Sequence, residues 1–84
     1  MSPLAPPYNP GVPTARLHLT FPEHLVEEPV IYTLGKRFDL VTNLRRANIN
    51  DRLAWVIIEV EGTAEAIEEA VAWLTDQGIQ VDRL

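Results

Sequence analysis

The first regular pattern in the chain is an alternation of polar and apolar residues from Arg16 to Phe21. Alternation with a period of two is typical of a strand with one face buried. Leu17, Leu19 and Phe21 are therefore expected to face a core, and the residues between them to face the other way. Pro22 ends this predicted strand, since proline cannot donate a backbone hydrogen bond.

Two later segments have the spacing of amphipathic helices. The first is predicted to begin at Glu27-Glu28-Pro29, where acidic residues and a proline suit the first turn, and its apolar residues are Val30, Ile31, Leu34 and Phe38. The second follows Gly62-Thr63, with Thr63 as its N-cap, and its central apolar residues are Ile67, Val71 and Leu74. Gly78 is placed to end this helix in a left-handed conformation. The chain then alternates again from Ile79 to Leu84, which predicts a last strand.

Between the helices lie two extended segments joined by a turn at Asn50-Asp51. The return strand, Leu53 to Val60, is clear: its even-numbered residues face the helices, while Trp55 and Ile57 face away. The preceding segment, Leu40 to Ile49, is less regular because two sets of apolar residues compete for the inward face. Such a conflict predicts a bulge or a weakly specified edge strand.

The resulting order of elements is βαββαβ, which is the ferredoxin-like α+β sandwich. It has an antiparallel four-stranded sheet with two helices on one face, and right-handed crossovers place the first and third strands in the centre. Residues 16–84 form this domain. Residues 1–15 form a Pro-rich N-terminal arm, because five of the seven prolines precede Thr14. The uncovered sheet face, with Trp55 and Ile57, requires a cover, either a partner subunit or this arm.

Composition narrows the possible functions. An 84-residue chain without cysteine gains no stability from disulfides or thiolate metal sites, so we expect a homo-oligomer, a dimer or higher assembly. The net charge of −5 disfavours nucleic acid as a partner. No apolar run reaches the ~20 residues of a membrane span, and no signal-peptide pattern is present. We expect a cytoplasmic protein without membrane insertion.

The sequence does not predict an enzyme. It has no cysteine nucleophile, no phosphate-binding glycine loop and only one serine, Ser2, in the arm. His18 and His24 have no ligand-type neighbours at metal-binding spacing. We therefore expect no catalytic residues, no metal and no cofactor.

Ligand binding or assembly is better supported. Asn43 and Asn48 offer amide groups on an edge strand, and Arg45 or Arg46 can hold a carboxylate through two hydrogen bonds. Trp55, Ile57 or Val41 would suit an apolar side chain. The alternative is that the asparagines serve turn geometry and the arginines protect an edge strand from unwanted pairing.

These residues also carry a family resemblance. The chain from Arg16 to Leu84 resembles the NIL domain, and the segments that carry the resemblance are Leu17-His18-Leu19-Thr20-Phe21, Glu28-Pro29-Val30-Ile31, Arg37-Phe38-Asp39-Leu40, Asn43-Leu44, Ala47-Asn48-Ile49, Ala66-Ile67, Trp73-Leu74 and Gly78. NIL domains are ferredoxin-like, related to ACT domains, and regulate methionine-importer ATPases. The chain lacks a P-loop and cysteines, so we expect a free-standing NIL domain that is neither the ATPase nor a cluster-binding protein.

The resemblance implies a regulatory module that binds methionine or a related amino acid at a homodimer interface. It implies that Asn43 and Asn48 contact the ligand, with Leu44 and Val41 as neighbours. We expect Trp55, Ile57, Arg45 and Arg46 to form the interface. Two alternatives remain: a ligand-free assembly module that binds a protein partner, and an accessory subunit of a sulfur-metabolism enzyme.

Overall fold

The computed structural model describes residues 13–22, 27–49 and 54–84. Six elements follow one another along the chain: β1 (Thr14–Phe21), α1 (Glu27–Phe38), β2 (Val41–Ile49), β3 (Ala54–Glu61), α2 (Ala64–Asp76) and β4 (Gln80–Arg83). The expectations for the arm before Pro13, for His24, for Leu53 and for the turn at 50–52 lie outside the described residues.

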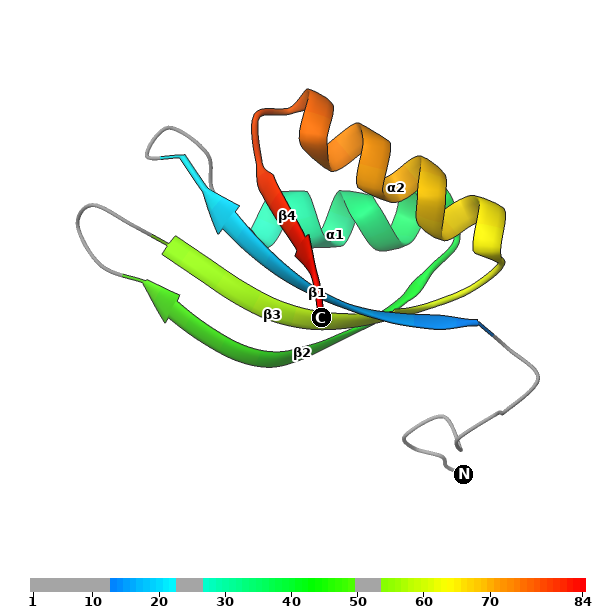
Figure 1. The fold of residues 1–84 in the computed structure, drawn as a ribbon, viewed down its shortest axis with the longest axis horizontal. Helices are drawn as coiled ribbons and strands as arrows, with labels where there is room; N and C mark the ends of the chain where they lie inside the picture. Colours follow the sequence, from blue (N-terminus) through cyan, green and yellow to red (C-terminus); the bar gives the residue numbers. More distant parts are fainter. Residues whose placement is uncertain (1–12, 23–26, 50–53) are drawn as a thin grey trace.

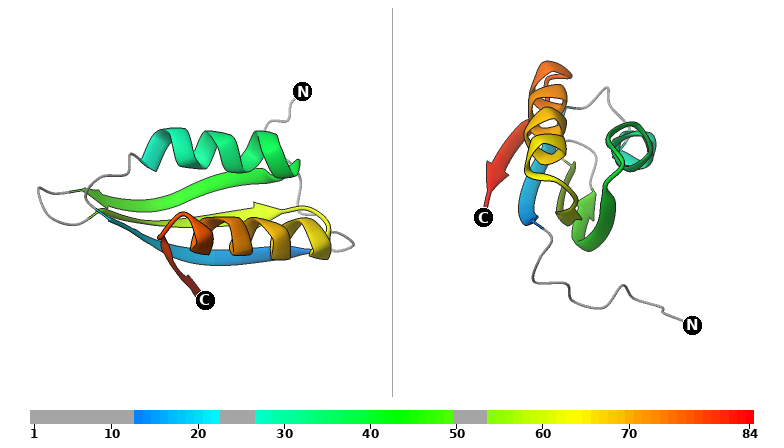
Figure 2. Two further views of the ribbon diagram at one scale, coloured as in Figure 1. Left: turned by 90° about the horizontal axis from the view of Figure 1, so that it is seen from above. Right: turned by 90° about the vertical axis from the view of Figure 1, so that its right-hand side faces the viewer.

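The four strands form one antiparallel sheet in the order β2-β3-β1-β4, with α1 and α2 on the same side of it (Figure 1). The end-on view in Figure 2 shows both helices over one face and nothing from the described chain over the other. This confirms the predicted ferredoxin-like sandwich, with the first and third strands in the centre. We call the uncovered side the open face.

The core lies between the sheet and the helices. The alternating residues of the central strands supply half of it, and α1 and α2 close it; the buried apolar residues are Leu17, Leu19, Phe21, Leu34, Leu40, Val56, Ile58, Val60, Ile67, Ala70, Leu74 and Ile79. Among the described residues, no polar side chain is buried with them. The period-two pattern of β1 and β3 thus fixes which face of the sheet meets the helices.

Both ends of α2 have the structure predicted for them, a threonine N-cap and a left-handed glycine. The Thr63 hydroxyl accepts a hydrogen bond from the Ala66 N–H at 3.0 Å, which caps α2. Gly78 has φ of 88°, and the N–H of Ile79 donates to the Leu74 carbonyl oxygen at 3.1 Å. This is the Schellman arrangement that ends helices. α1 ends in the same way at Asp39, a non-glycine residue with φ of 56°, where the N–H of Leu40 donates to the Gly35 carbonyl oxygen at 3.1 Å.

The strand boundaries differ slightly from those predicted. β1 begins at Thr14 rather than Arg16, because Thr14 and Ala15 pair with the end of β3. β4 is shorter than predicted, since Ile79 belongs to the helix-ending motif. The Leu84 N–H still donates to the Arg16 carbonyl oxygen at 2.9 Å, so the last residue remains beside β1.

Candidate functional site

A bulge in β2 determines which side chains reach the open face. Asn43 lies opposite Glu59 and Leu44 opposite Ile58, but the next paired residue is Arg46, opposite Ile57. Arg45 is therefore the extra residue of a bulge; the irregular pattern predicted a bulge or a weakly specified edge strand but not this position. In a regular strand, two consecutive residues point to opposite faces; here the bulge turns both arginines toward the open face.

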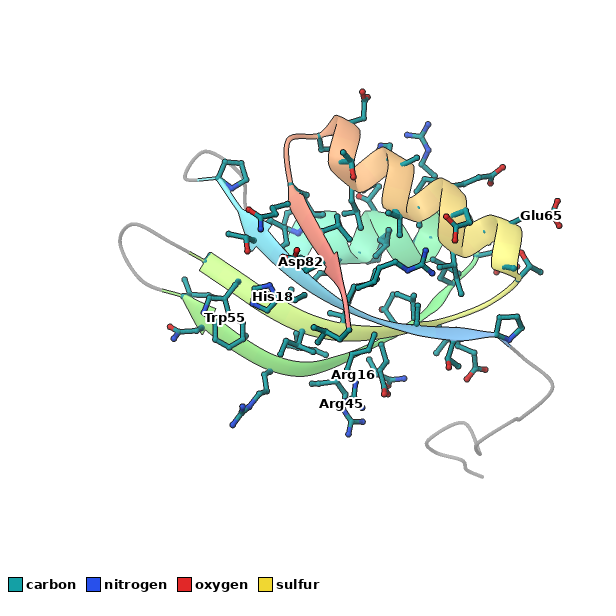
Figure 3. All side chains as sticks on the ribbon, in the orientation of Figure 1. Arg16, His18, Arg45, Trp55, Glu65 and Asp82 are labelled. Atoms are coloured by element: carbon teal, nitrogen blue, oxygen red, sulfur yellow. The ribbon has the colours of Figure 1, made fainter. Side chains whose placement is uncertain are left out.

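The ion pairs of Glu59 show where Arg45 points. The Arg45 Nη1 atom lies 3.6 Å from Glu59 Oε1, and the Arg16 Nη2 atom lies 2.8 Å from Glu59 Oε2. Figure 3 shows Arg16 and Arg45 reaching the same region of the open face. The hydrogen bond from Arg16 is the largest cause that lowers the pKa of Glu59 below its ordinary value; desolvation opposes it, and the charges of Arg45 and Arg16 lower the pKa further. Glu59 is therefore an anion held between two guanidinium groups.

The two arginines also line a shallow depression with a volume of about 330 Å³. We call it the arginine hollow, and its lining residues are Arg16, Arg45, Arg46, Ile57 and Leu84. The three arginines come from β1 and β2, and the apolar residues come from β3 and the chain after β4. An acidic chain thus presents one concave region with three cationic side chains and an apolar wall.

Beside the hollow lies an aromatic pair. The rings of His18 and Trp55 stack with centroids 5.1 Å apart and an angle of 23° between their planes. The Nδ1 atom of His18 lies 3.9 Å from Asp82 Oδ2, an attraction that exists only when the imidazole is protonated. Trp55 and Ile57 are only partly buried, so the open face has an apolar centre, as predicted.

The predicted ligand-binding residues divide between the two faces of the sheet. Val41, Asn43 and Asn48 share the open face, because they pair with Glu61, Glu59 and Trp55, whose side chains also lie there. Leu44 lies on the helix side, opposite Ile58. The structure thus brings three of these four residues to one face and separates Leu44 from them.

Reasoning from the sequence missed Arg16, Glu59 and Leu84. Arg16 and Glu59 each occupy a polar position in the alternating pattern of a central strand. Such a position usually indicates only exposure to solvent. Their opposite charges in an antiparallel pair were a usable signal, because the fold places the start of β1 beside the end of β3. Leu84 gave no signal beyond its apolar character.

Two further classes of site were searched for. Over residues 13–22, 27–49 and 54–84, no three histidine, cysteine or carboxylate side chains gather as metal ligands would. In the same part of the chain, no helix is long and apolar enough to cross a membrane.

Fold and surface together place the chain among the small ferredoxin-like α+β domains that leave one sheet face open. The family model of the NIL domain matches residues 15–83, and the chain belongs to this family. The predicted resemblance is thereby confirmed.

The chain is similar to two proteins named methionine import ATP-binding protein MetN. The one from Coxiella burnetii is 27% identical over 74 residues, which are 83% of this chain and 21% of that protein. The one from Myxococcus xanthus is 28% identical over 71 residues, 80% of this chain and 22% of that protein. The chain thus spans about one fifth of the length of these relatives.

A solved structure shares the fold. It is the C-terminal domain of an ABC transporter ATP-binding protein from Enterococcus faecalis, with a TM-score of 0.73 and 15% sequence identity. The match covers 83% of this chain and 82% of that one, so the whole ferredoxin-like domain corresponds.

Proposed function

We propose that this chain is a regulatory module, without catalytic activity of its own, that binds a small amino acid next to a homodimer interface along β2. The observation that carries the proposal is membership of the NIL family, whose similar members include proteins named for methionine import. Methionine or a related amino acid is accordingly the first ligand to test.

The β2 edge supports a homodimer. β2 pairs only with β3 in the described sheet, so its outer backbone groups can pair with another strand. On its helix side, Leu44 is 57% and Ile49 is 60% exposed. Two antiparallel β2 strands related by a two-fold axis would extend the sheet across both protomers and cover these side chains.

α1 adds to the same surface. Gly35 faces β2, since a Cβ atom at this position would lie 3.8 Å from the Thr42 side chain. Tyr32 stands one turn earlier on the same side of the helix and is 67% exposed. The apolar edge of the molecule therefore includes helix as well as strand, which suits an interface between two identical protomers.

The open face supports ligand binding close to that edge. Asn43 and Asn48 present amide groups there, and the arginine hollow adds charge of the sign that an α-carboxylate requires. Trp55, Ile57, Arg45 and Arg46 were predicted to form the interface. On this proposal they belong instead to the ligand-binding surface next to the interface.

Two measurements test this function. Isothermal titration against the twenty amino acids should give heat for methionine or a close relative. Sedimentation equilibrium should give a dimer, and Leu44→Glu should yield a folded monomer, because an uncompensated charge would be buried at the interface. Trp55→Glu is the matched control for the open face and should leave the dimer mass unchanged.

A second candidate is a ligand-free assembly module, favoured by the exposed apolar edge of Leu44, Ile49 and Tyr32. It predicts the same dimer and no heat with any amino acid. A monomer without heat would overturn both candidates. A role as an accessory subunit of a sulfur-metabolism enzyme would appear as a co-purifying enzyme, with Leu44→Glu reducing capture.

A further inference from the structure

The centre of the open face is apolar, and the described chain leaves it uncovered. Trp55 and Ile57 of β3 and His18 of β1 are only half-buried there. The rings of His18 and Trp55 stack with centroids 5.1 Å apart, as Figure 3 shows, and both helices lie on the other side of the sheet (Figure 2). An exposed patch of apolar and aromatic side chains marks an interaction surface.

The sequence of residues 1–12 has the composition of a ligand for an aromatic surface. It contains four prolines and no charged side chain, which favours the polyproline II helix with its three residues per turn. Leu4, Pro7 and Pro10 recur with this period and form an apolar stripe on one side of such a helix, whereas Ala5 falls on another side. Segments with two prolines at this spacing bind grooves lined by aromatic side chains.

Pro13 joins this segment to one end of the open face. Its carbonyl oxygen accepts a hydrogen bond from the Gly62 N–H at 3.1 Å, so the segment enters the sheet beside the end of β3. Trp55 pairs with Thr20, six residues after the first residue of β1, which is about 20 Å along the strand. Residues 1–12 span about 37 Å in a polyproline II conformation, which is more than this distance.

The polar side chains that flank the apolar centre interact with one another. Arg16 pairs with Glu59 at 2.8 Å, and Asp82 accepts a hydrogen bond from the Gln80 amide at 3.1 Å. Asp82 also lies 3.9 Å from His18. A highly charged partner would therefore find few charges at this centre with which to pair, and an uncharged segment suits it better.

We propose that residues 1–12 bind across the open face of their own chain, antiparallel to β1, with the apolar stripe on His18 and Trp55. The Pro10-Gly11 pair suits the second and third positions of a type II turn, which reverses the chain where it enters the sheet. Leu4 lies six residues before Pro10, so the turn brings it over Trp55. The bound segment follows the two central strands and leaves the outer strand β2 accessible. Tethering favours this occupant over a second copy, because a linked segment acts at an effective concentration of about millimolar.

NMR spectroscopy of the isotope-labelled 84-residue chain, without any ligand, tests this contact. Nuclear Overhauser effects should connect the Leu4 methyl groups with the Trp55 ring. Leu4→Asp should abolish them and shift the Trp55 indole N–H signal, because a charge is costly to bury against the ring. Ala5→Asp is the matched control: it adds the same charge on another side of the helix and should keep the contacts. Trp73, whose ring packs against Phe38 with centroids 5.8 Å apart, should not shift in either variant.

The outcomes separate binding within one chain from the other ways to cover the open face. Contacts between Leu4 and Trp55 that do not change on dilution of the protein support the proposal. The absence of these contacts in the wild type would overturn it, as would equal shifts of Trp55 in Leu4→Asp and Ala5→Asp. Contacts that disappear on dilution would contradict it and assign the open face to a second copy of the chain. Because no amino acid is present, the proposed function can fail without changing these results.

Discussion

β1 and β2 lie in the same sheet, yet their helix-facing side chains have opposite environments. In β1, Leu17 and Leu19 are fully buried, whereas in β2 Leu44 and Ile49 are more than half exposed. β1 pairs on both sides and cannot shift without breaking two ladders. Within the described sheet, β2 pairs on one side only and accommodates an extra residue. The register of β1 is therefore fixed by two neighbouring strands, whereas the outer edge of β2 in the described sheet can bind a partner.

The first prediction tests this difference in burial with the same substitution in each strand. Leu17→Ala should lower the free energy of unfolding by about 2–5 kcal/mol, because it leaves a cavity at a fully buried site. Leu44→Ala, the same substitution on β2, should change it by less than about 0.5 kcal/mol in the monomer. Urea denaturation at low protein concentration measures both. Equal losses would mean that β2 is packed as tightly as β1.

The second prediction concerns the extra residue in β2. Deletion of Arg45 restores regular alternation and keeps Leu44 opposite Ile58 and Arg46 opposite Ile57, so stability should change by less than about 1 kcal/mol. Deletion of Thr20 from β1 is the control. It turns the end of that strand to the wrong face and should unfold the domain. Cross-strand contacts measured by NMR report the register, and their loss after deletion of Arg45 would argue against a simple bulge.

The third and smallest effect is a dependence on pH. The lowered pKa of Glu59 means that the folded state favours the ionised carboxylate. Its contribution to stability is full above the ordinary value of 4.5 and is lost as the pH falls through the lowered folded value. Urea midpoints from about pH 6 to about pH 3 should therefore fall less steeply for Glu59→Gln than for the wild type. Parallel curves would count against the ion pairs with Arg16 and Arg45.

Much of the fold was predictable because local rules agree with one another along most of the chain. The alternation of β1, the Thr63 cap and the Gly78 helix end each specify structure within a few residues. The bulge was predictable from the conflict between apolar sets in β2, but its position was not, because only pairing with β3 places the extra residue at Arg45.

The candidate site was less predictable. Asn43, Asn48, Arg45 and Arg46 were identified as polar residues on an edge strand. Glu59, which pairs with Arg45, and Arg16, which pairs with Glu59, come from other strands. A contact between residues 43 positions apart has no local signature, so it required the register of the whole sheet. The bulge places Arg45 beside Arg16 and Glu59, and no single residue of β2 indicates it.

The central claim is that the open face beside the β2 bulge binds a free amino acid. Its most direct test is a titration of the ¹⁵N-labelled protein with L-methionine, followed by two-dimensional NMR. We expect shifts concentrated at Arg16, Arg46, Ile57, Glu59 and Leu84, with the amides of α2 unmoved. Saturable shifts confined to the helices, or no shifts at any concentration of L-methionine, would contradict the claim.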